Sequence, residues 1–305
     1  MYRLGFLSGL PSNPLLPRLV TALRDRGSVE GSDFVIESRS SEQDPKRAVA
    51  LAADLAAQPV DVIVTVNTAH AVAAKQATSS VPIVMFTSGF PVEVGLAGSL
   101  GRPGGNVTGL SIHAGTALFG KYVELLREVA SSMRKLGVMW DYTPPSFAEK
   151  EIEVSLGELR RSASSLNIDT RVWMNGDDRE VTDALAAAAR SRVDALFVTG
   201  GPIHARAVNA RRIAEVSTRR RLPMLNDFRG PLFEAGGFLL YAVDLNDLAI
   251  RTAYFIERIR KGAKPGDLPI EQPSRFLMTI NLKTAKALGL TISPSLLARA
   301  DQVIE

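Results

Sequence analysis

Small polar residues, glycines and aromatic rings follow several short apolar runs of the sequence, at the points where predicted strands end. In the first half of the chain they are Ser8, Gly9, Asn67, Thr68, Thr87, Ser88, Gly89 and Phe90, and in the second half Asp141, Tyr142, Gly200, Gly201, Asn226, Asp227, Phe228 and Tyr241. In open parallel sheets, ligands bind beyond the carboxyl ends of the strands, where helix N-termini are exposed. For any single residue, a turn or a cap is the simpler interpretation. Taken together, the set predicts a site for a small molecule.

The groups needed for catalysis or for metal binding are not arranged in any familiar pattern. The histidines are His70, His113 and His204, and their spacing matches no zinc motif. We expect polar capping or surface roles for His70 and His204. The stretch 109–113 departs from a nucleophile elbow at its last position, where His113 stands in place of glycine. The sequence therefore predicts no catalytic residue, no metal and no cofactor.

One stretch imitates a phosphate-binding loop. Residues 115–122 have the spacing of that motif, with Gly120 and Lys121 in the expected places. Tyr122, however, replaces the Ser or Thr that would hold magnesium, and the stretch is apolar. We interpret it as the start of an amphipathic helix.

Composition gives the size and class of the protein. A chain of 305 residues with 46% hydrophobic and 22% charged residues fits two globular domains. It contains no cysteine, which excludes disulfides and thiolate metal sites. No apolar run has the length of a transmembrane helix. The three arginines at 219–221 have no aromatic residues among them, and we interpret them as the solvated end of a helix. No nucleic-acid partner is therefore expected.

Short apolar runs alternate with amphipathic stretches, which is typical of β-α-β units and parallel sheets. Asp44 followed by Pro45 marks a helix start. The expected strands are 4–7, 34–36, 60–66, 81–86 and 107–112, and the expected helices include 14–26, 45–57, 68–77, 117–130 and 246–261.

The same order of segments occurs twice. Residues 135–140 resemble 3–8, residues 193–199 resemble 60–66, and residues 222–227 resemble 81–86, each pair about 130 to 140 positions apart. A chance similarity between two buried strands explains one such pair of segments well. It explains three matching pairs in the same order poorly. The sequence thus predicts an α/β protein of two Rossmann-like lobes with parallel sheets. We expect an N-terminal lobe of residues 1–112 and 243–273, a C-terminal lobe of 113–242 and 274–305, and a ligand cleft between them.

Several stretches resemble the substrate-binding proteins of ABC transporters, in the group that includes tryptophan- and tyrosine-binding lipoproteins. They are 4–9 (LGFLSG), 71–78 (AVAAKQAT), 99–111 (SLGRPGGNVTGLS), 270–273 (IEQP) and 280–290 (INLKTAKALGL). The resemblance implies a type I periplasmic-binding-protein fold, which delivers a ligand to a membrane permease and its ATPase. This chain has Asp141 and Tyr142 where the family often has Asn-Pro, and residues 226–229 also depart from the family pattern. The identity of the ligand is therefore open.

The leading hypothesis is a solute-binding receptor of an ABC importer for an amino acid or an aromatic carboxylate. A ligand carboxylate is expected near Ser8, Asn67–Thr68 and Thr87–Ser88, and an ammonium at Asp141 or Asp227. An apolar moiety is expected against aromatic residues of the site, namely Phe90, Tyr142, Phe228 and Tyr241.

Two other functions were weighed. The alternative to the receptor is a cytoplasmic ligand-sensing domain of the same fold, which is disfavoured because no helix-turn-helix precedes Leu4. An enzyme on paired lobes is disfavoured by the absence of catalytic motifs. Residues 1–7 do not form a signal peptide. For the receptor, we therefore expect a periplasmic or extracytoplasmic location after removal of a signal.

Overall fold

The computed structural model describes residues 1–113, 117–142 and 149–305. Residue contacts divide the described chain into two compact units. Unit 1 contains residues 1–113, 149–153 and 244–275, and unit 2 contains residues 117–142, 154–243 and 276–305. Each unit is therefore assembled from three separate stretches of the chain.

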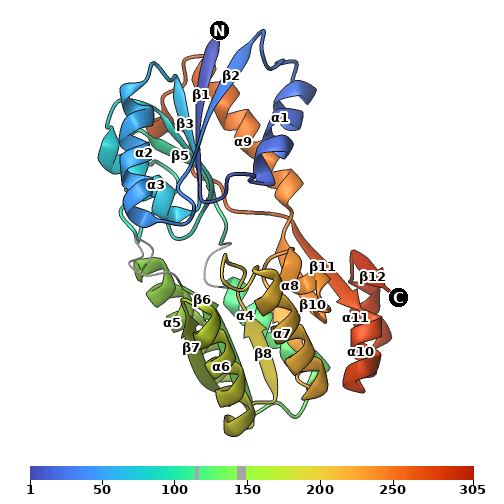
Figure 1. Ribbon diagram of the computed structural model, residues 1–305. Helices are drawn as coiled ribbons and strands as arrows, with labels where there is room; N and C mark the ends of the chain where they lie inside the picture. Colours follow the sequence, from blue (N-terminus) through green and yellow to red (C-terminus); the bar gives the residue numbers. More distant parts are fainter. Residues whose placement is uncertain (114–116, 143–148) are drawn as a thin grey trace. The chain divides into compact units, whose positions relative to one another are not determined.

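Unit 1 is built on a five-stranded parallel sheet in the order β2-β1-β3-β4-β5 (Figure 1). The strands are β1 (Tyr2–Ser8), β2 (Phe34–Ser40), β3 (Val62–Val66), β4 (Ile83–Ser88) and β5 (Val107–Ser111). The central strands β3 and β4 are mostly apolar and almost entirely buried, as expected for a sheet covered on both faces. Because all five strands are parallel, their carboxyl ends lie along one edge of the sheet.

Helices cover both faces of this sheet. The helices of unit 1 are α1 (Leu15–Asp25), α2 (Pro45–Ala57), α3 (Thr68–Ala77) and α9 (Leu245–Arg260). Helices α2 and α3 pack together on one face, and α1 packs against α9 on the other. Asp44 caps α2 as predicted, since its side chain accepts hydrogen bonds from the backbone N–H groups of Lys46 and Arg47.

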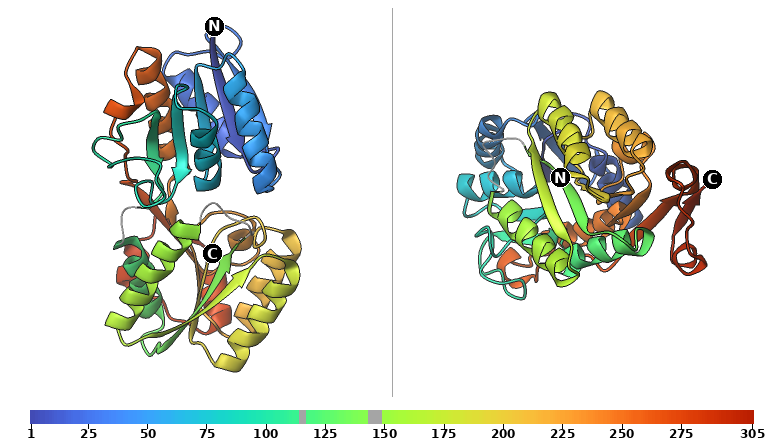
Figure 2. Two further views of the ribbon diagram at one scale, coloured as in Figure 1. Left: turned by 90° about the vertical axis from the view of Figure 1, so that its left-hand side faces the viewer. Right: turned by 90° about the horizontal axis from the view of Figure 1, so that it is seen from below.

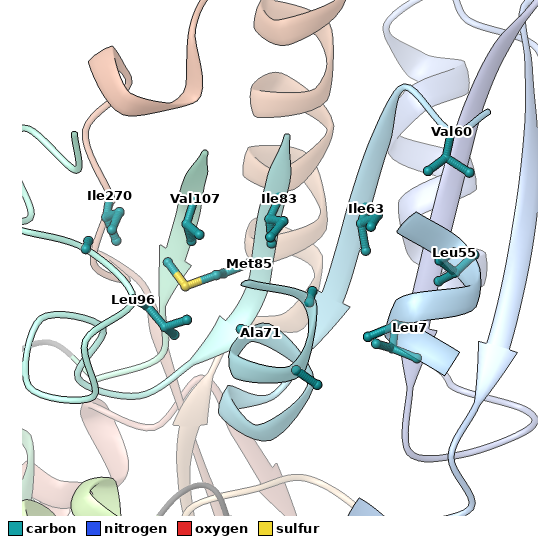
Figure 3. Close-up of a cluster of buried hydrophobic side chains, with 14 residues drawn as sticks. Leu7, Leu55, Val60, Ile63, Ala71, Ile83, Met85, Leu96, Val107 and Ile270 are labelled. Atoms are coloured by element: carbon teal, nitrogen blue, oxygen red, sulfur yellow. The ribbon is translucent and has the colours of Figure 1, made fainter. Parts of the chain in front are cut away.

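The main core of unit 1 lies between the sheet and the pair α2 and α3 (Figure 3). Ile63, Ile83 and Met85 project from the sheet toward Leu55 of α2 and Ala71 of α3, and all five are fully buried. Truncating a Leu, Ile or Met side chain to Ala in a close-packed core lowers the free energy of unfolding by about 2–5 kcal/mol. This layer fixes the starts of α2 and α3 relative to the strand ends.

Unit 2 contains a seven-stranded sheet in the order β12-β11-β10-β9-β8-β6-β7. Its strands are β6 (Lys135–Asp141), β7 (Asp169–Asn175), β8 (Ala195–Val198), β9 (Met224–Asn226), β10 (Leu239–Val243), β11 (Phe276–Asn281) and β12 (Gln302–Ile304). Strands β6 to β10 are parallel, and β11 pairs with β10 in the antiparallel sense. The last two strands extend the sheet beyond the five that unit 1 has.

Helices also lie on both faces of the unit 2 sheet (Figure 2). They are α4 (Ala117–Val129), α5 (Glu149–Ser165), α6 (Asp178–Ser191), α7 (Ala207–Arg219), α8 (Pro231–Glu234), α10 (Leu282–Leu288) and α11 (Pro294–Ala298). The first residues of α5, 149–153, belong to unit 1. Apolar side chains of α6 and α7, including Leu185 and Ile213, pack on Met139 and Val198 of the sheet. On the other face, Arg127 of α4 donates a hydrogen bond to the carbonyl of Leu166, just after α5.

The order β7-β6-β8-β9-β10 in unit 2 repeats the order β2-β1-β3-β4-β5 in unit 1. The predicted α/β class with two parallel-sheet lobes is thus confirmed. The expected helix 68–77 coincides with α3, and the other expected elements agree to within two residues at most ends.

Candidate ligand-binding site

The start of α3 is the best-defined part of the carboxyl-end edge in unit 1. Asn67 has a left-handed backbone conformation with φ of 70°. Its side-chain oxygen accepts a hydrogen bond from the backbone N–H of His70 at 3.0 Å. The Asn67 backbone N–H donates to Oγ1 of Thr87 at 3.2 Å. The amide side chain therefore holds the helix start, and Thr87 ties it to the end of β4.

The predicted hydroxyls of unit 1 hold neighbouring strand ends together. Thr68 Oγ1 accepts hydrogen bonds from Ser88 Oγ at 3.2 Å and from the Gly89 backbone N–H at 2.9 Å. Ser8 donates through Oγ to the carbonyl of Leu10 at 3.0 Å. Ser8, Thr68 and Ser88 are all buried. Their direct role is to fix the loops, and a ligand at this edge meets the backbone and helix start that they position.

Two glycines of the predicted set lie against the ends of long polar side chains. A Cβ atom at Gly9 would lie 2.6 Å from Oε1 of Gln43. A Cβ at Gly89 would collide with the side chain of Glu151, at the start of α5. The Glu151 carboxylate also lies 3.3 Å from Nε2 of His113. Both contacts are with the flexible ends of long side chains, which can move aside, so they do not by themselves require glycine in either turn.

Phe90 follows Gly89 with φ of 43°, an unusual conformation for an aromatic residue. Its ring stacks on the imidazole of His113 with a centroid distance of 4.8 Å. Phe90 is 6% exposed. The ring therefore contributes a buried aromatic wall beside the 88–90 turn.

His70 is buried beneath the same edge, and the expectation of a capping or surface role is wrong. Its Nδ1 lies 2.5 Å from the carbonyl of Val66 and 2.7 Å from Oδ1 of Asn67, and its Nε2 lies 3.0 Å from Oγ of Ser41. The imidazole thus links the end of β3 to the loop after β2. Burial lowers the pKa of His70 to about 4, although the contact with the Val66 carbonyl opposes this shift.

His204 does the same in unit 2, where the expected capping or surface role is also wrong. Its Nδ1 lies 2.8 Å from the carbonyl of Thr199, and its Nε2 lies 2.9 Å from Oδ1 of Asn175 at the end of β7. Burial lowers the pKa of His204 to about 4 as well. Both histidines are neutral and connect neighbouring strand ends through hydrogen bonds. In the sequence, each is followed by alanine at the matching position of the repeat, as His70-Ala71 and His204-Ala205, and this repetition was the signal for them.

Asp141 ends β6 and is buried, with a side chain only 3% exposed. Its Oδ2 accepts a hydrogen bond from the His204 backbone N–H at 2.7 Å, and the Ile203 backbone N–H adds a second contact. Its own N–H donates to Thr199 Oγ1 at 2.8 Å. Burial raises the pKa of Asp141 to about 7, and the two backbone donors only partly offset it. The carboxyl therefore fastens the 199–204 loop to β6.

Asp227 lies just after β9, at the same edge of unit 2, and is half-buried. One of its carboxylate oxygens accepts a hydrogen bond from the Gly200 backbone N–H at 2.6 Å. Its charge also contributes to raising the pKa of the Tyr122 hydroxyl, an effect whose main cause is burial. The Asp227 carboxylate therefore acts electrostatically on the Tyr122 hydroxyl.

Tyr122, which the sequence interpretation did not include in the site, belongs to an aromatic group in unit 2. Its ring stacks on Phe197 at 4.8 Å and meets Tyr241 edge-on at 6.2 Å. Tyr241 stacks in turn on Phe276 at 5.3 Å. Tyr122 lies in α4, as the amphipathic-helix interpretation predicted, whereas the start of the phosphate-loop imitation, at 115 and 116, is outside the described residues.

The remaining predicted residues of unit 2 surround these carboxylates. A Cβ at Gly201 would collide with the side chain of Asp141, and a Cβ at Gly200 with that of Phe228. Tyr142 donates its backbone N–H to the carbonyl of Asn175 at 2.9 Å. Asn226 is buried, and its Nδ2 is 3.4 Å from the carbonyl of Val198. The structure thus brings the predicted residues of each unit together along one sheet edge, except for Tyr241. The expectation that Tyr241 follows a strand is wrong, because it is the central residue of β10 and pairs with Met278 of β11.

Two surface pockets of unit 1 lie elsewhere. A pocket of about 410 Å³ is lined by Tyr2, Asp33, Asp61 and Arg260, among others, at the amino ends of the strands. Another, of about 450 Å³, lies beside the Arg251 and Glu271 ion pair. Neither includes a residue of the predicted ligand set. Within the described residues, no group of three or more His, Asp or Glu side chains is placed to hold a metal.

Residues 17–304 match the family of ABC transporter substrate binding proteins. The chain belongs to this family. Its members bind solutes rather than transform them, which agrees with the expectation that the protein is not an enzyme. No helix in the described ranges is long and apolar enough to cross a membrane.

Known relatives of the family resemble the whole chain. A tyrosine-binding protein of Clostridioides difficile is 25% identical over 288 residues, covering 93% of this chain and 80% of the relative. A Streptococcus pneumoniae structure in complex with L-Trp is 25% identical, with a TM-score of 0.85 and 99% of both chains covered. These relatives support the resemblance that the sequence motifs indicated.

The fold itself extends further than the family. A leucine-binding protein of Thermotoga maritima has a TM-score of 0.65 at 13% identity, with 94% of this chain and 87% of that chain covered. It places the fold among the type I periplasmic binding proteins. At this identity only the fold is comparable, so the functional argument rests on the family and on the site residues.

Proposed function

We propose that this protein is the solute-binding receptor of an ABC importer and that its ligand is an aromatic α-amino acid. The observation that carries the choice of ligand is the position of Asp227 just after β9, at the carboxyl-end edge of unit 2, where its charge acts on the hydroxyl of Tyr122 in the aromatic group. A carboxylate next to aromatic rings suits an ammonium group joined to an apolar side chain. The tyrosine-binding and tryptophan-bound relatives support the same class of ligand.

Of the two aspartates that the sequence singled out, Asp227 is the better ammonium partner. Asp141 is buried, and its carboxyl is engaged by the backbone N–H groups of residues 203 and 204. With a pKa of about 7, it is also protonated in part at neutral pH. The Asp227 carboxylate accepts a hydrogen bond from the Gly200 backbone N–H, and a carboxylate can accept hydrogen bonds from several donors at once.

We place the ligand carboxylate at the carboxyl-end edge of unit 1. The first turn of α3 begins at Thr68, and its backbone N–H groups carry the positive end of the helix dipole. The hydrogen bonds of Asn67, Thr68 and Ser88 hold this turn and the 88–90 turn in fixed positions. In our proposal, the ligand links this edge to the Asp227 edge of unit 2, and the lobes close on it.

Calorimetric titration with L-tryptophan and L-tyrosine, and with the same molecules lacking the amino group, tests the proposal. We expect Asp227→Asn to weaken amino-acid binding at least tenfold, because losing one partner of a buried charged pair costs about 2–5 kcal/mol. The isosteric variant Asp141→Asn is the matched control and should bind within a fewfold of the wild type. If the deaminated analogues bind as tightly as the amino acids, or if Asp227→Asn changes nothing, the ammonium site is wrong.

The role in import requires a permease and its ATPase as partners and a location outside the cytoplasmic membrane. Family membership supports both. A permease and an ATPase encoded beside this gene, together with loss of amino-acid uptake when the gene is deleted, are the expected findings. Intact uptake in the deletion strain would argue for a ligand-sensing role instead.

A further inference from the structure

One edge of unit 2 is strongly basic. It is formed where the strands begin, by residues 134–135, 169–171, 190–194 and 219–221, which we call the basic edge. The sheet register places these segments side by side: Lys135 pairs with Asp169, and the Asp194 backbone N–H donates to the carbonyl of Lys135 at 2.8 Å. The carboxyl ends of α6 and α7 lie at this same end of unit 2 (Figure 1).

The charge of the basic edge exceeds that of the whole molecule. Its four segments contain eight basic and two acidic residues, a formal net charge of +6, whereas the chain as a whole carries +4. Unit 1 has the same topology and supplies an internal comparison. The corresponding segments there, 2–3, 35–37, 57–61 and 78–80, contain one basic and two acidic residues. In both units, the carboxyl ends of helices lie near the starts of the strands. Helix dipoles therefore do not account for the difference in charge between the two sets of segments.

The basic side chains are not neutralised within the protein. In the described part of the chain, no hydrogen bond or ion pair involves the guanidinium groups of Arg190, Arg192 or the three arginines at 219–221. The Asp194 carboxylate is taken up by the backbone N–H groups of residues 134 and 135, both at 2.8 Å. Only Arg171 has an acidic partner, Asp169 at 3.0 Å.

Two of these arginines occupy positions where glycine is the preferred residue. Arg192 ends α6 with φ of 51°, and Arg221 follows the end of α7 with φ of 55°. A left-handed residue after a helix is usually glycine, because other side chains are strained there. Arg190 in the last turn of α6 and Arg219 in the last turn of α7 already place a positive charge at the negative end of each helix dipole. The additional arginines thus add charge at a conformational disadvantage.

We propose that the basic edge binds the surface of an anionic phospholipid membrane. Arginine forks match phosphate oxygens in pairs, and clusters of basic residues bind anionic lipid surfaces through the summed charge. The four segments contain no aromatic residue, whereas protein interfaces draw most of their energy from aromatic and arginine anchors in pockets. Charge spread over four chain segments suits a fluid array of headgroups better than one fixed partner. The inference does not depend on the identity of the ligand.

Co-sedimentation of the full chain with vesicles tests this surface. The probes are vesicles of phosphatidylglycerol mixed with phosphatidylcholine, and vesicles of phosphatidylcholine alone. The variant is Arg219→Gln, Arg220→Gln and Arg221→Gln combined. The matched control combines Arg24→Gln, Lys46→Gln and Lys264→Gln, three exposed charges of unit 1. Thermal unfolding and amino-acid titration of each protein verify that the fold and the ligand site are intact.

We expect the wild type to bind the anionic vesicles and to lose binding as salt rises, because the attraction is screened. At roughly fivefold per basic side chain, the triple variant should partition about a hundredfold less at low salt, and the control should change less than threefold. Equal binding to both kinds of vesicle, or a triple variant that binds like the wild type, would overturn the proposal. So would tighter binding to poly-glutamate than to the vesicles at equal charge, because that result indicates an acidic protein partner.

Discussion

Replacing Asp141 by Asn should remove one contribution to the pH dependence of the stability of unit 2. The folded protein holds this carboxyl at a pKa of about 7, and its ordinary value is 3.8. Because the folded pKa is raised, the stabilisation is complete below pH 3.8 and is lost as pH rises toward 7. Within that window the free energy of unfolding falls by about 1.4 kcal/mol per pH unit. Between pH 5 and pH 8 the loss is roughly 2–3 kcal/mol.

Asn at this position keeps an oxygen that can accept the hydrogen bond of the His204 backbone N–H, but it carries no titrating proton. The stability of the variant relative to the wild type should therefore improve by roughly 2–3 kcal/mol between pH 5 and pH 8. Urea unfolding at constant ionic strength, followed by tryptophan fluorescence, is a suitable assay. The two tryptophans, Trp140 and Trp173, both lie in unit 2, so the signal reports on the lobe that contains Asp141.

The exposed Asp183→Asn variant on α6 is the control, and its stability relative to the wild type should not depend on pH in this range. Parallel stability curves for wild type and Asp141→Asn would refute the reasoning. They would mean that the backbone donors at 203 and 204, or bound water, compensate fully for the burial of the carboxylate.

Three other changes test the structure. His204→Gln removes a group whose pKa is lowered to about 4, so unfolding free energy in urea should fall about 1.4 kcal/mol per pH unit less steeply as pH drops from 6.5 to 4.5; an unchanged slope contradicts the burial of His204. Gly201→Ala forces a Cβ against Asp141 and should lower stability by about 1–3 kcal/mol in thermal unfolding, whereas an unchanged midpoint would show that the loop yields freely. Asp44→Ala removes the cap of α2 and should cost about 1 kcal/mol in urea unfolding, with Asp44→Asn largely restoring it.

The elements of unit 1 were predictable because local signals and burial agree there. The Asp44-Pro45 pair marked a helix start, and the apolar run of β3 and β4 marked buried strands. The repeated order of strands then predicted the second lobe. β11 and β12 were harder to foresee, because their pairing depends on contacts between residues far apart in the chain.

The candidate site was only partly predictable. Position at strand ends identified Asp141 and Asp227 equally, since the sequence does not show which carboxyl is buried. The structure separates them by their hydrogen-bond partners, which are the backbone N–H groups of residues 203 and 204 for Asp141 and that of Gly200 for Asp227. Tyr122 was missed because it lies inside a helix, and only the packed sheet brings it next to Phe197. The ligand assignments of the other residues remain predictions for the titrations described above.

Because each unit is assembled from three separate stretches of the chain, neither can be completed from one continuous segment. The sheet of unit 1 receives α9, which packs on β4 and β5, only after most of unit 2 has been synthesised. The sheet of unit 2 receives β11 later still. During synthesis from the N-terminus, the face of the first sheet that α9 covers therefore stays incompletely covered from the end of β5 until α9 has been made. Such late, distant contacts slow folding and favour aggregation of intermediates. We expect this protein to depend on molecular chaperones during synthesis. We also expect a fragment ending near residue 112 to be insoluble when it is expressed alone.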